Sequence, residues 1–236
     1  MEISKRFGKF LQAFELISDV GMLFLKETKM FRSNIERSKS DWHVLIELGF
    51  NNSSVEEDVY ETLNNLFTKN IVSNVVVGDT EAKARNLWKI REDIPEANRK
   101  IGAITSHDIS LPLENIESFI IKSLIEIKEI NKLLRVNCFG HMGDGNLHFN
   151  IFPPKGEKST SYFKIKPKLT NIINNNCKSL EGSFSAEHGV GRLKVKDLKQ
   201  YCDPGKFHVM CQLKKAMDPL AILNPGVIVS RDTQDI

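Results

Sequence analysis

Cysteine is scarce in this sequence of 236 residues. The chain has four cysteines, and they are Cys138, Cys177, Cys202 and Cys211. No two of them form a C-x-x-C pair, so the sequence supports neither a zinc ribbon nor a dithiol redox motif. We expect four reduced thiols.

Long hydrophobic runs are missing as well. No uninterrupted apolar stretch reaches the roughly 18 to 20 residues that a membrane-spanning helix needs. Near the amino terminus, basic residues precede an apolar stretch, but Glu15 and Asp19 interrupt it, unlike the core of a signal peptide. We therefore expect a cytoplasmic protein with no membrane span.

Neither sign of charge is in large excess. The chain has 33 Lys and Arg against 30 Asp and Glu, a net charge of +3, and no basic block dense enough to predict nucleic-acid binding. Hydrophobic residues make up 41% and charged residues 27%, as in ordinary globular proteins. A chain of this length can bury a substantial core. We expect one domain, or a domain with a smaller appendage, and no nucleic-acid partner.

Hydrophobic spacing predicts several helices. Apolar residues close to helical spacing predict an amphipathic helix over residues 7–26. Further helices are expected over residues 54–66, 80–101, 112–130, 160–180 and 205–217. Ser54 and Glu57 are spaced as a capping box for the second of these helices, and Pro95 is expected to kink or interrupt the third.

Strand patterns lie between the predicted helices. They cover residues 42–50, 71–78 and 104–111, followed by a hairpin of residues 133–141 and 146–152. This alternation, closed by an antiparallel hairpin, predicts an α+β fold with a ferredoxin-like antiparallel sheet covered by helices. Residues 1–155 would form the α+β region, and residues 156–236 a helical carboxyl-terminal segment.

Histidine is also infrequent, with six in the chain, yet two histidines flank one turn in "HMGDGNLHFN", residues 141–150. A two-residue Asp-Gly turn of type I′ would place His141 directly opposite His148. Opposed residues share a face with Cβ atoms about 4.5–5.5 Å apart, so both imidazoles could reach one metal ion. Asn146 and Asn150 share that face, because strand side chains repeat with a period of two. The alternative is a hydrogen-bonded pair of surface histidines beside a turn.

A second unusual stretch is "SFSAEHGVGR", residues 183–192, in which glycines surround Glu187 and His188. A carboxylate is the usual third ligand when two histidines hold a catalytic zinc with one position open. His188 would then be free as a general base, because its pKa range suits proton transfer near neutrality. The alternative is a loop in which Glu187 pairs with Arg192, and spacing leaves both interpretations open.

Several motifs together carry a family resemblance. "GHMGDGNLHFN", "SAEHGVGR" and "DPLAILNPGVI" resemble the carboxyl-terminal half of flavin-linked 2-hydroxy-acid dehydrogenases, which include D-lactate dehydrogenases, the glycolate oxidase subunit and D-2-hydroxyglutarate dehydrogenase. "FLQAFELIS", "LIELG", "LWKIRED" and "HDISLP" extend the resemblance in the same order over nearly the whole chain. Within this family the sequence resembles the D-2-hydroxyglutarate enzyme in particular.

This resemblance implies a metal centre and a base. His141, His148 and Glu187 would bind a divalent metal, expected to be zinc, which grips the carboxylate and hydroxyl of a D-2-hydroxy acid. His188 would take the hydroxyl proton as hydride leaves the α-carbon for FAD. A Lewis-acid ion and a nearby base are chemically suited to these roles.

The resemblance also implies contacts to substrate and cofactor. Arg91 in "LWKIRED" would bind the substrate carboxylate, a task that suits a bidentate guanidinium. Its alternative is a helix-surface ion pair with Glu92 or Asp93. Asn150 resembles a further substrate-side residue. Asn224 would contribute to the contact with the flavin side.

Two positions depart from the family pattern. Ser106 stands where similar members have a substrate-binding lysine, which puts recognition of a second carboxylate in doubt. Pro95 stands where the hydroxyglutarate enzyme has a threonine. Both departures bear on the substrate and leave the predicted metal ligands intact.

A flavin-binding region is not found in this sequence. Family members begin with a domain that wraps the FAD pyrophosphate, and no G-x-G-x-x-G occurs here. Since no side chain can accept a hydride, we expect the chain to need a separate FAD-binding chain for activity. The alternatives are a non-catalytic truncated remnant that keeps the fold, and a zinc hydrolase that uses His188 as its base.

Overall fold

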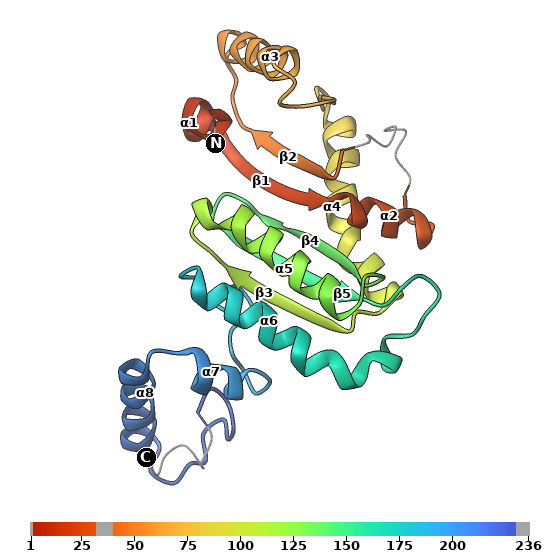
Figure 1. Cartoon of the computed structure of the whole chain (residues 1–236). Helices are drawn as coiled ribbons and strands as arrows, with labels where there is room; N and C mark the ends of the chain where they lie inside the picture. The colour runs from red at the N-terminus through yellow and green to blue at the C-terminus, as the bar shows by residue number, and fades with distance from the viewer. Residues whose placement is uncertain (1, 32–39, 230–236) are drawn as a thin grey trace.

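The computed structural model describes residues 2–31 and 40–229 and contains a five-stranded sheet (Figure 1). Its strands are β1 (Leu11–Ser18), β2 (Trp42–Leu48), β3 (Thr105–Ser110), β4 (Arg135–His141) and β5 (Asn146–Phe152). They lie in the order β2-β1-β4-β5-β3, and every neighbouring pair is antiparallel. The α+β class predicted from the sequence is confirmed.

Helices cover both faces of the sheet, with α5 in front and α4 behind in Figure 1. One face packs against α5 (Ile116–Ile130) and α6 (Lys166–Ser179), the other against α2 (Asp19–Glu27) and α4 (Glu81–Ile101). The remaining helices are α1 (Glu2–Phe7), α3 (Ser53–Thr68), α7 (Val195–Tyr201), α8 (Pro204–Met217) and the short 3-10 helices Gly8–Phe10, Leu113–Asn115 and Ser159–Ile165. None of the described helices is long and apolar enough to cross a membrane.

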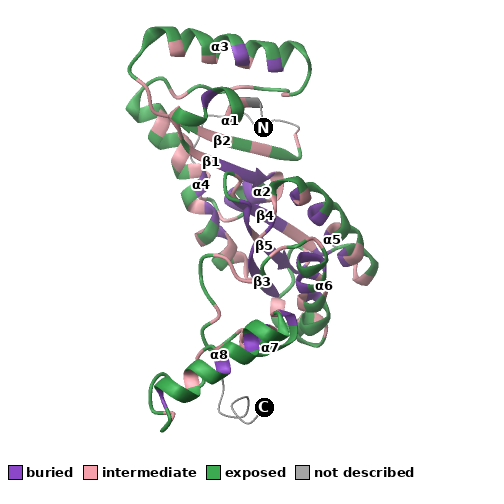
Figure 2. Ribbon diagram, turned by 90° about the vertical axis from the view of Figure 1, so that its left-hand side faces the viewer, coloured by how far each residue is buried: buried purple, intermediate pink, exposed green. Residues whose placement is uncertain are grey.

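Side chains of β5 alternate between the main core and the face that carries the candidate site. Leu147, Phe149 and Ile151 are each 0% exposed and pack toward α5 and α6. His148 and Asn150 point to the opposite face, because successive side chains of a strand alternate. Figure 2 shows the buried residues concentrated in the sheet and on the inner sides of its helices. The strand that anchors the core therefore also carries the candidate site.

The helix predicted over residues 7–26 is wrong. Residues 11–18 form β1, and the helix α2 begins only at Asp19. β1 lies between β2 and β4 and pairs with both, so neighbouring strands satisfy its backbone hydrogen bonds. Both of its faces are covered, with Leu16 in one core and Ile17 in the other. Because both faces are buried, apolar residues do not alternate with polar ones along this strand. Their spacing therefore resembled that of a helix.

The strand predicted over residues 71–78 is also wrong. No strand forms there, and Ile71, Val76 and Val77 remain 62%, 48% and 38% exposed. Among the described strands none pairs with this segment, so its β-branched residues have no ladder to join. A favourable composition does not make a strand without a neighbour.

Helix details differ from the predictions at two positions. The cap of α3 is Asn52, whose side-chain oxygen accepts a hydrogen bond of 3.0 Å from the Ser54 backbone N–H, so the predicted capping box of Ser54 and Glu57 is wrong. The helix predicted over residues 80–101 is α4, and it continues through Pro95 without interruption. The remaining predicted helices and strands are present, and α1 and α7 are additional described helices that the pattern did not predict.

His107 on β3 is buried on the α6 side of the sheet and makes a 3.0 Å hydrogen bond with the Thr105 hydroxyl. Burial, with Lys194 and Lys166 nearby, lowers the pKa of His107 to about 3. An unfolded histidine titrates near about 6.5. Between these values the unfolded chain binds a proton that the folded chain does not, so the stability present at higher pH is lost as the pH falls.

We therefore expect His107→Gln to flatten the pH dependence of folding. Well inside this window one proton changes the free energy of unfolding by about 1.4 kcal/mol per pH unit. Urea unfolding of the wild type and the variant at pH 7, 6 and 5 measures the difference. Parallel curves for the two proteins would show that His107 is not held neutral.

Candidate functional site

The hairpin of β4 and β5 presents two imidazoles on one face, but in a different register from the prediction. Phe139, not His141, pairs with His148, and residues 142–145 form the connection. The predicted two-residue turn is therefore wrong. A shift of two positions leaves side chains on the same face, since strands repeat with a period of two. The rings of His141 and His148 lie 6.0 Å apart, measured between centroids.

The longer connection is explained by its contacts with the strands beside it. The Met142 N–H donates to the Phe14 carbonyl at 2.7 Å, and the Leu111 N–H donates to the Gly145 carbonyl at 3.0 Å. Gly145 has φ +75°, and a Cβ there would lie 2.0 Å from the Leu111 carbonyl oxygen. Tertiary contacts on both sides therefore select this four-residue loop and require its last glycine.

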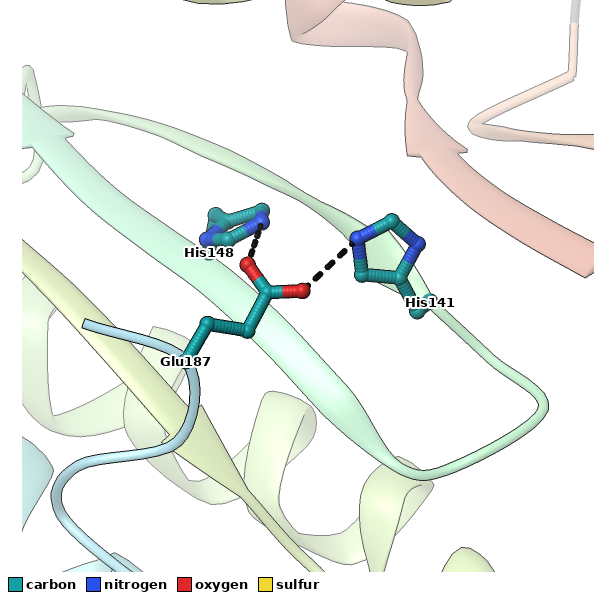
Figure 3. A group of neighbouring side chains, drawn as sticks. All are labelled: His141, His148 and Glu187. Atoms are coloured by element: carbon teal, nitrogen blue, oxygen red, sulfur yellow. Dashed lines mark ion pairs between the residues drawn. The ribbon is translucent and has the colours of Figure 1, made fainter. Parts of the chain in front are cut away.

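Glu187, on the loop between α6 and α7, brings a carboxylate to both imidazoles (Figure 3). Its Oε1 lies 3.0 Å from Nε2 of His141, and its Oε2 lies 3.6 Å from Nε2 of His148. One potential ligand atom from each residue lies within 4.8 Å of the others. Among the described residues Glu187 pairs with these two histidines, and Arg192 is not among its partners. The structure thus brings the three predicted ligands together.

Asp108 on β3 fixes the loop that carries Glu187. Its Oδ2 accepts hydrogen bonds from the backbone N–H groups of Glu187 and His188, at 2.8 and 2.9 Å. A short antiparallel bridge between Ser110 and Ser183 aligns the loop with the edge of the sheet. One buried carboxylate therefore positions two candidate site residues from a segment about 80 residues away in sequence.

The pKa values of two site residues are shifted. Burial acts to raise the pKa of Asp108, but the His188 N–H, the Asn146 amide and the neighbouring histidines outweigh it and hold that pKa below its usual range. Burial lowers the pKa of His148 and prevails over the opposing effects of Asp108 and Glu187. At neutral pH Asp108 is therefore ionised, and the His148 imidazole is neutral, the form that binds metals.

Glu15 on β1 is a site residue that the sequence analysis did not identify. It is only 3% exposed, its Oε1 lies 2.6 Å from Nδ1 of His141, and its Oε2 accepts a 2.7 Å hydrogen bond from Nε of Arg91. Arg91 also lies over the Phe139 ring at 4.7 Å. The predicted alternative, a surface pair of Arg91 with Glu92 or Asp93, does not form: Arg91 is itself buried against Glu15.

Glu15 and Asp108 could have been noticed as acidic residues inside the strand-like stretches "AFELIS" and "HDISL". A carboxylate in a buried strand needs a partner, because an unpaired buried charge is costly. That signal indicates a polar cluster without identifying its other members.

The donor set fits a divalent metal ion. Each imidazole directs Nε2 toward Glu187 and Nδ1 toward another carboxylate, Glu15 at 2.6 Å for His141 and Asp108 at 3.6 Å for His148. The contact of His141 is typical of metal-binding histidines, whose second nitrogen is held by a carboxylate. The contact of His148 with Asp108 is too long for a hydrogen bond. Two imidazoles and one carboxylate suit zinc and leave a coordination position open.

His188 and Asn150 lie beside these three residues. Nδ1 of His188 is 3.1 Å from Oδ2 of Asp108, while its side chain is 68% exposed. Its ring is 5.9 Å from that of His148, measured between centroids. Asn150 is buried on the same sheet face as His148 and donates to the His148 carbonyl at 3.3 Å. Both residues are placed next to the potential ligands and not among them.

Asn224 is separate from this cluster. It is exposed, has φ +45°, and lies in the segment after α8. Within the described ranges no hydrogen bond, ion pair or ring contact joins it to the histidines. The predicted role of Asn224 at the flavin side therefore involves no contact with these site residues.

Ser106 is also exposed, and its place opposite Asn150 puts it on the site face.

The fold and site define an α+β domain with imidazoles and carboxylates gathered on one face of an antiparallel sheet. Residues 1–228 match the model of the FAD linked oxidases, C-terminal domain. The chain belongs to this family and corresponds to its carboxyl-terminal domain.

Similar proteins agree with this assignment. The chain is 32% identical to D-2-hydroxyglutarate dehydrogenase, mitochondrial, of Arabidopsis thaliana, over 95% of this chain and 39% of that protein. It is 30% identical to a putative mitochondrial D-lactate dehydrogenase of Schizosaccharomyces pombe, over 95% and 43%, and 29% identical to a D-2-hydroxyglutarate dehydrogenase of Stutzerimonas stutzeri, over 92% and 47%. The chain thus spans less than half the length of these relatives.

Proposed function

We propose that this domain is the substrate- and metal-binding part of an FAD-dependent dehydrogenase that oxidises a D-2-hydroxy acid to the 2-oxo acid. The observation that carries the proposal is the convergence of His141, His148 and Glu187 beside the Asp108–His188 pair. The names of the similar proteins, D-2-hydroxyglutarate and D-lactate dehydrogenase, support this class of substrate.

His141, His148 and Glu187 would hold a divalent ion, which we propose to be zinc. When bound, such an ion supplies Lewis-acid stabilisation to a carboxylate or hydroxyl oxygen. Arg91 uses Nε for Glu15, so its two terminal nitrogens remain to orient the substrate carboxylate. Asn150 adds an amide on the same face. These residues bind and orient the hydroxy acid.

His188 would act as the base. Asp108 holds Nδ1, which leaves Nε2 to receive the hydroxyl proton of the substrate. The C–H electron pair leaves as hydride, and the C–O bond becomes C=O. FAD would accept that hydride, and we expect it to be held largely by polypeptide outside the 236 residues, with Asn224 on its side.

An exposed apolar surface supports a further polypeptide packing here. Val209, Leu213 and Met217 follow one another at four-residue intervals on α8 and are 55%, 59% and 79% exposed. Leu220 and Ile222, in the segment that follows α8, are also exposed, at 70% and 69%. Grouped apolar side chains of this kind mark interaction sites. We expect the flavin-holding polypeptide to cover this surface.

The test is metal analysis and visible spectroscopy of the protein isolated in the form that its cell makes. We expect one zinc ion per chain and a flavin absorbance that D-lactate or D-2-hydroxyglutarate bleaches and their L-enantiomers do not. A His188→Gln variant should keep zinc and flavin but bleach about 10² to 10⁴ times more slowly, the usual contribution of a positioned base. Metal without flavin, or flavin that no D-2-hydroxy acid bleaches, would contradict the proposed reaction.

A further inference from the structure

Glu15 connects two functional residues that belong to different parts of the chain. Its carboxylate oxygens are divided between Nδ1 of His141, at 2.6 Å, and Nε of Arg91, at 2.7 Å. The Glu15 side chain is 4% exposed and that of Arg91 10%. Water therefore has little access to this carboxylate. Because Glu15 bonds both His141 and Arg91, the position of each of these side chains depends on that of the other.

We propose that Glu15 is a positioning residue that sets metal affinity by fixing the tautomer of His141, a proposal that rests on the metal site proposed above. A carboxylate can only accept hydrogen bonds, so it favours a proton on Nδ1 of His141. Glu187 also faces His141, at 3.0 Å from Nε2, but its side chain is 44% exposed against 4% for Glu15, so water weakens its pull on the proton. The nearer, buried Glu15 therefore decides the tautomer, and Nε2 keeps its lone pair. The same carboxylate keeps the Arg91 guanidinium beside the cluster.

Glutamine at position 15 cannot replace both interactions. Its amide offers one accepting oxygen and one donating NH₂ group. If the oxygen accepts from Arg91, the NH₂ group faces Nδ1 of His141 and favours the proton on Nε2. In that tautomer a proton occupies Nε2, so this nitrogen has no lone pair with which to bind a metal ion.

The experiment compares zinc affinity in the 236-residue chain by competition with a chromophoric chelator. We expect Glu15→Gln to weaken zinc binding about 10- to 100-fold, as is usual when the group behind a metal-binding histidine is lost. Glu27→Gln is the matched control, because Glu27 also pairs with an arginine, Arg135, at 2.9 Å. The control should bind zinc within about twofold of the wild type, because Glu27 has no contact with the cluster.

A purely structural role for Glu15 is tested separately. Breaking the buried pair with Arg91 can weaken folding, so a Glu15→Leu/Arg91→Met double variant removes both charges together. It should fold yet still bind zinc about 10- to 100-fold more weakly, because Nδ1 of His141 has lost its acceptor. Nitrogen-15 NMR of the metal-free proteins near pH 8 reports the His141 tautomer directly. We expect the Nδ1–H form in the wild type and an increased Nε2–H form in Glu15→Gln.

Two results would overturn the proposal, and they are distinguishable. Wild-type zinc affinity in Glu15→Gln and in the folded double variant, with the Nδ1–H tautomer retained in Glu15→Gln, would leave the metal site intact and reject the role of Glu15. Absence of zinc binding by the unmodified chain would reject the proposed metal site and, with it, this proposal.

Discussion

His148→Ala is expected to weaken zinc binding about 100- to 1,000-fold. Structural zinc sites with four ligands have a binding free energy of roughly 10–16 kcal/mol, so one ligand accounts for about 2.5–4 kcal/mol. Each 1.4 kcal/mol is about tenfold in affinity. The His148 side chain is 16% exposed, and its Nε2 already points toward Glu187. Its imidazole can therefore bind a metal without changing rotamer. Chelator competition on the purified chain measures the change.

The control for this variant is His208→Ala. His208 is exposed on α8, outside the histidine cluster, and its removal should leave zinc affinity within about twofold of the wild type. Circular dichroism would check that the His148 variant keeps its fold, because the ring packs 4.9 Å from that of Phe139. Equal zinc affinity in the His148 variant and the wild type would reject the ligand set.

Phe149→Ala is expected to destabilise the metal-free protein by about 3–5 kcal/mol, the usual cost of removing a fully buried aromatic ring. Phe149 is 0% exposed and stacks edge to face with Phe119 of α5, with ring centroids 5.4 Å apart. In a chain of this size the change corresponds to a fall of about 6–20 °C in Tm. Urea and thermal unfolding measure both quantities.

Phe163→Ala is the matched control. Phe163 lies in the 3-10 helix Ser159–Ile165 and is 78% exposed, so its removal should change stability by less than about 0.5 kcal/mol. A similar loss of stability in both variants would show that the β5 side chains do not anchor the core as described.

The two hairpin histidines illustrate what a local pattern predicts well. "HMGDGNLHFN" indicates two strands and a short connection, and the period of two keeps His141 and His148 on one face even though the turn and register were wrong. A register error of one position would have placed the two histidines on opposite faces of the sheet. The error of two arose because Phe14 and Leu111, distant in sequence, bond to the connection.

The β1 segment illustrates where local pattern fails. Apolar spacing predicted a helix, whereas pairing with β2 and β4 makes residues 11–18 a strand. In this strand Glu15 forms hydrogen bonds with Arg91, 76 positions later in the sequence, and with His141, 126 positions later. No local window contains these partners, so neither the buried ion pair nor the support of His141 is predictable from spacing.

The sequence by itself determined the α+β class, most helices and strands, and the residue types that could bind a metal, because periodicity and side-chain chemistry are local properties. Only the tertiary structure decided that Glu187 reaches both imidazoles and that Asp108 and Glu15 lie behind them. The physical reason is that a buried carboxylate is stabilised by specific donors, and here those donors come from strands, a helix and a loop that only the folded sheet brings together.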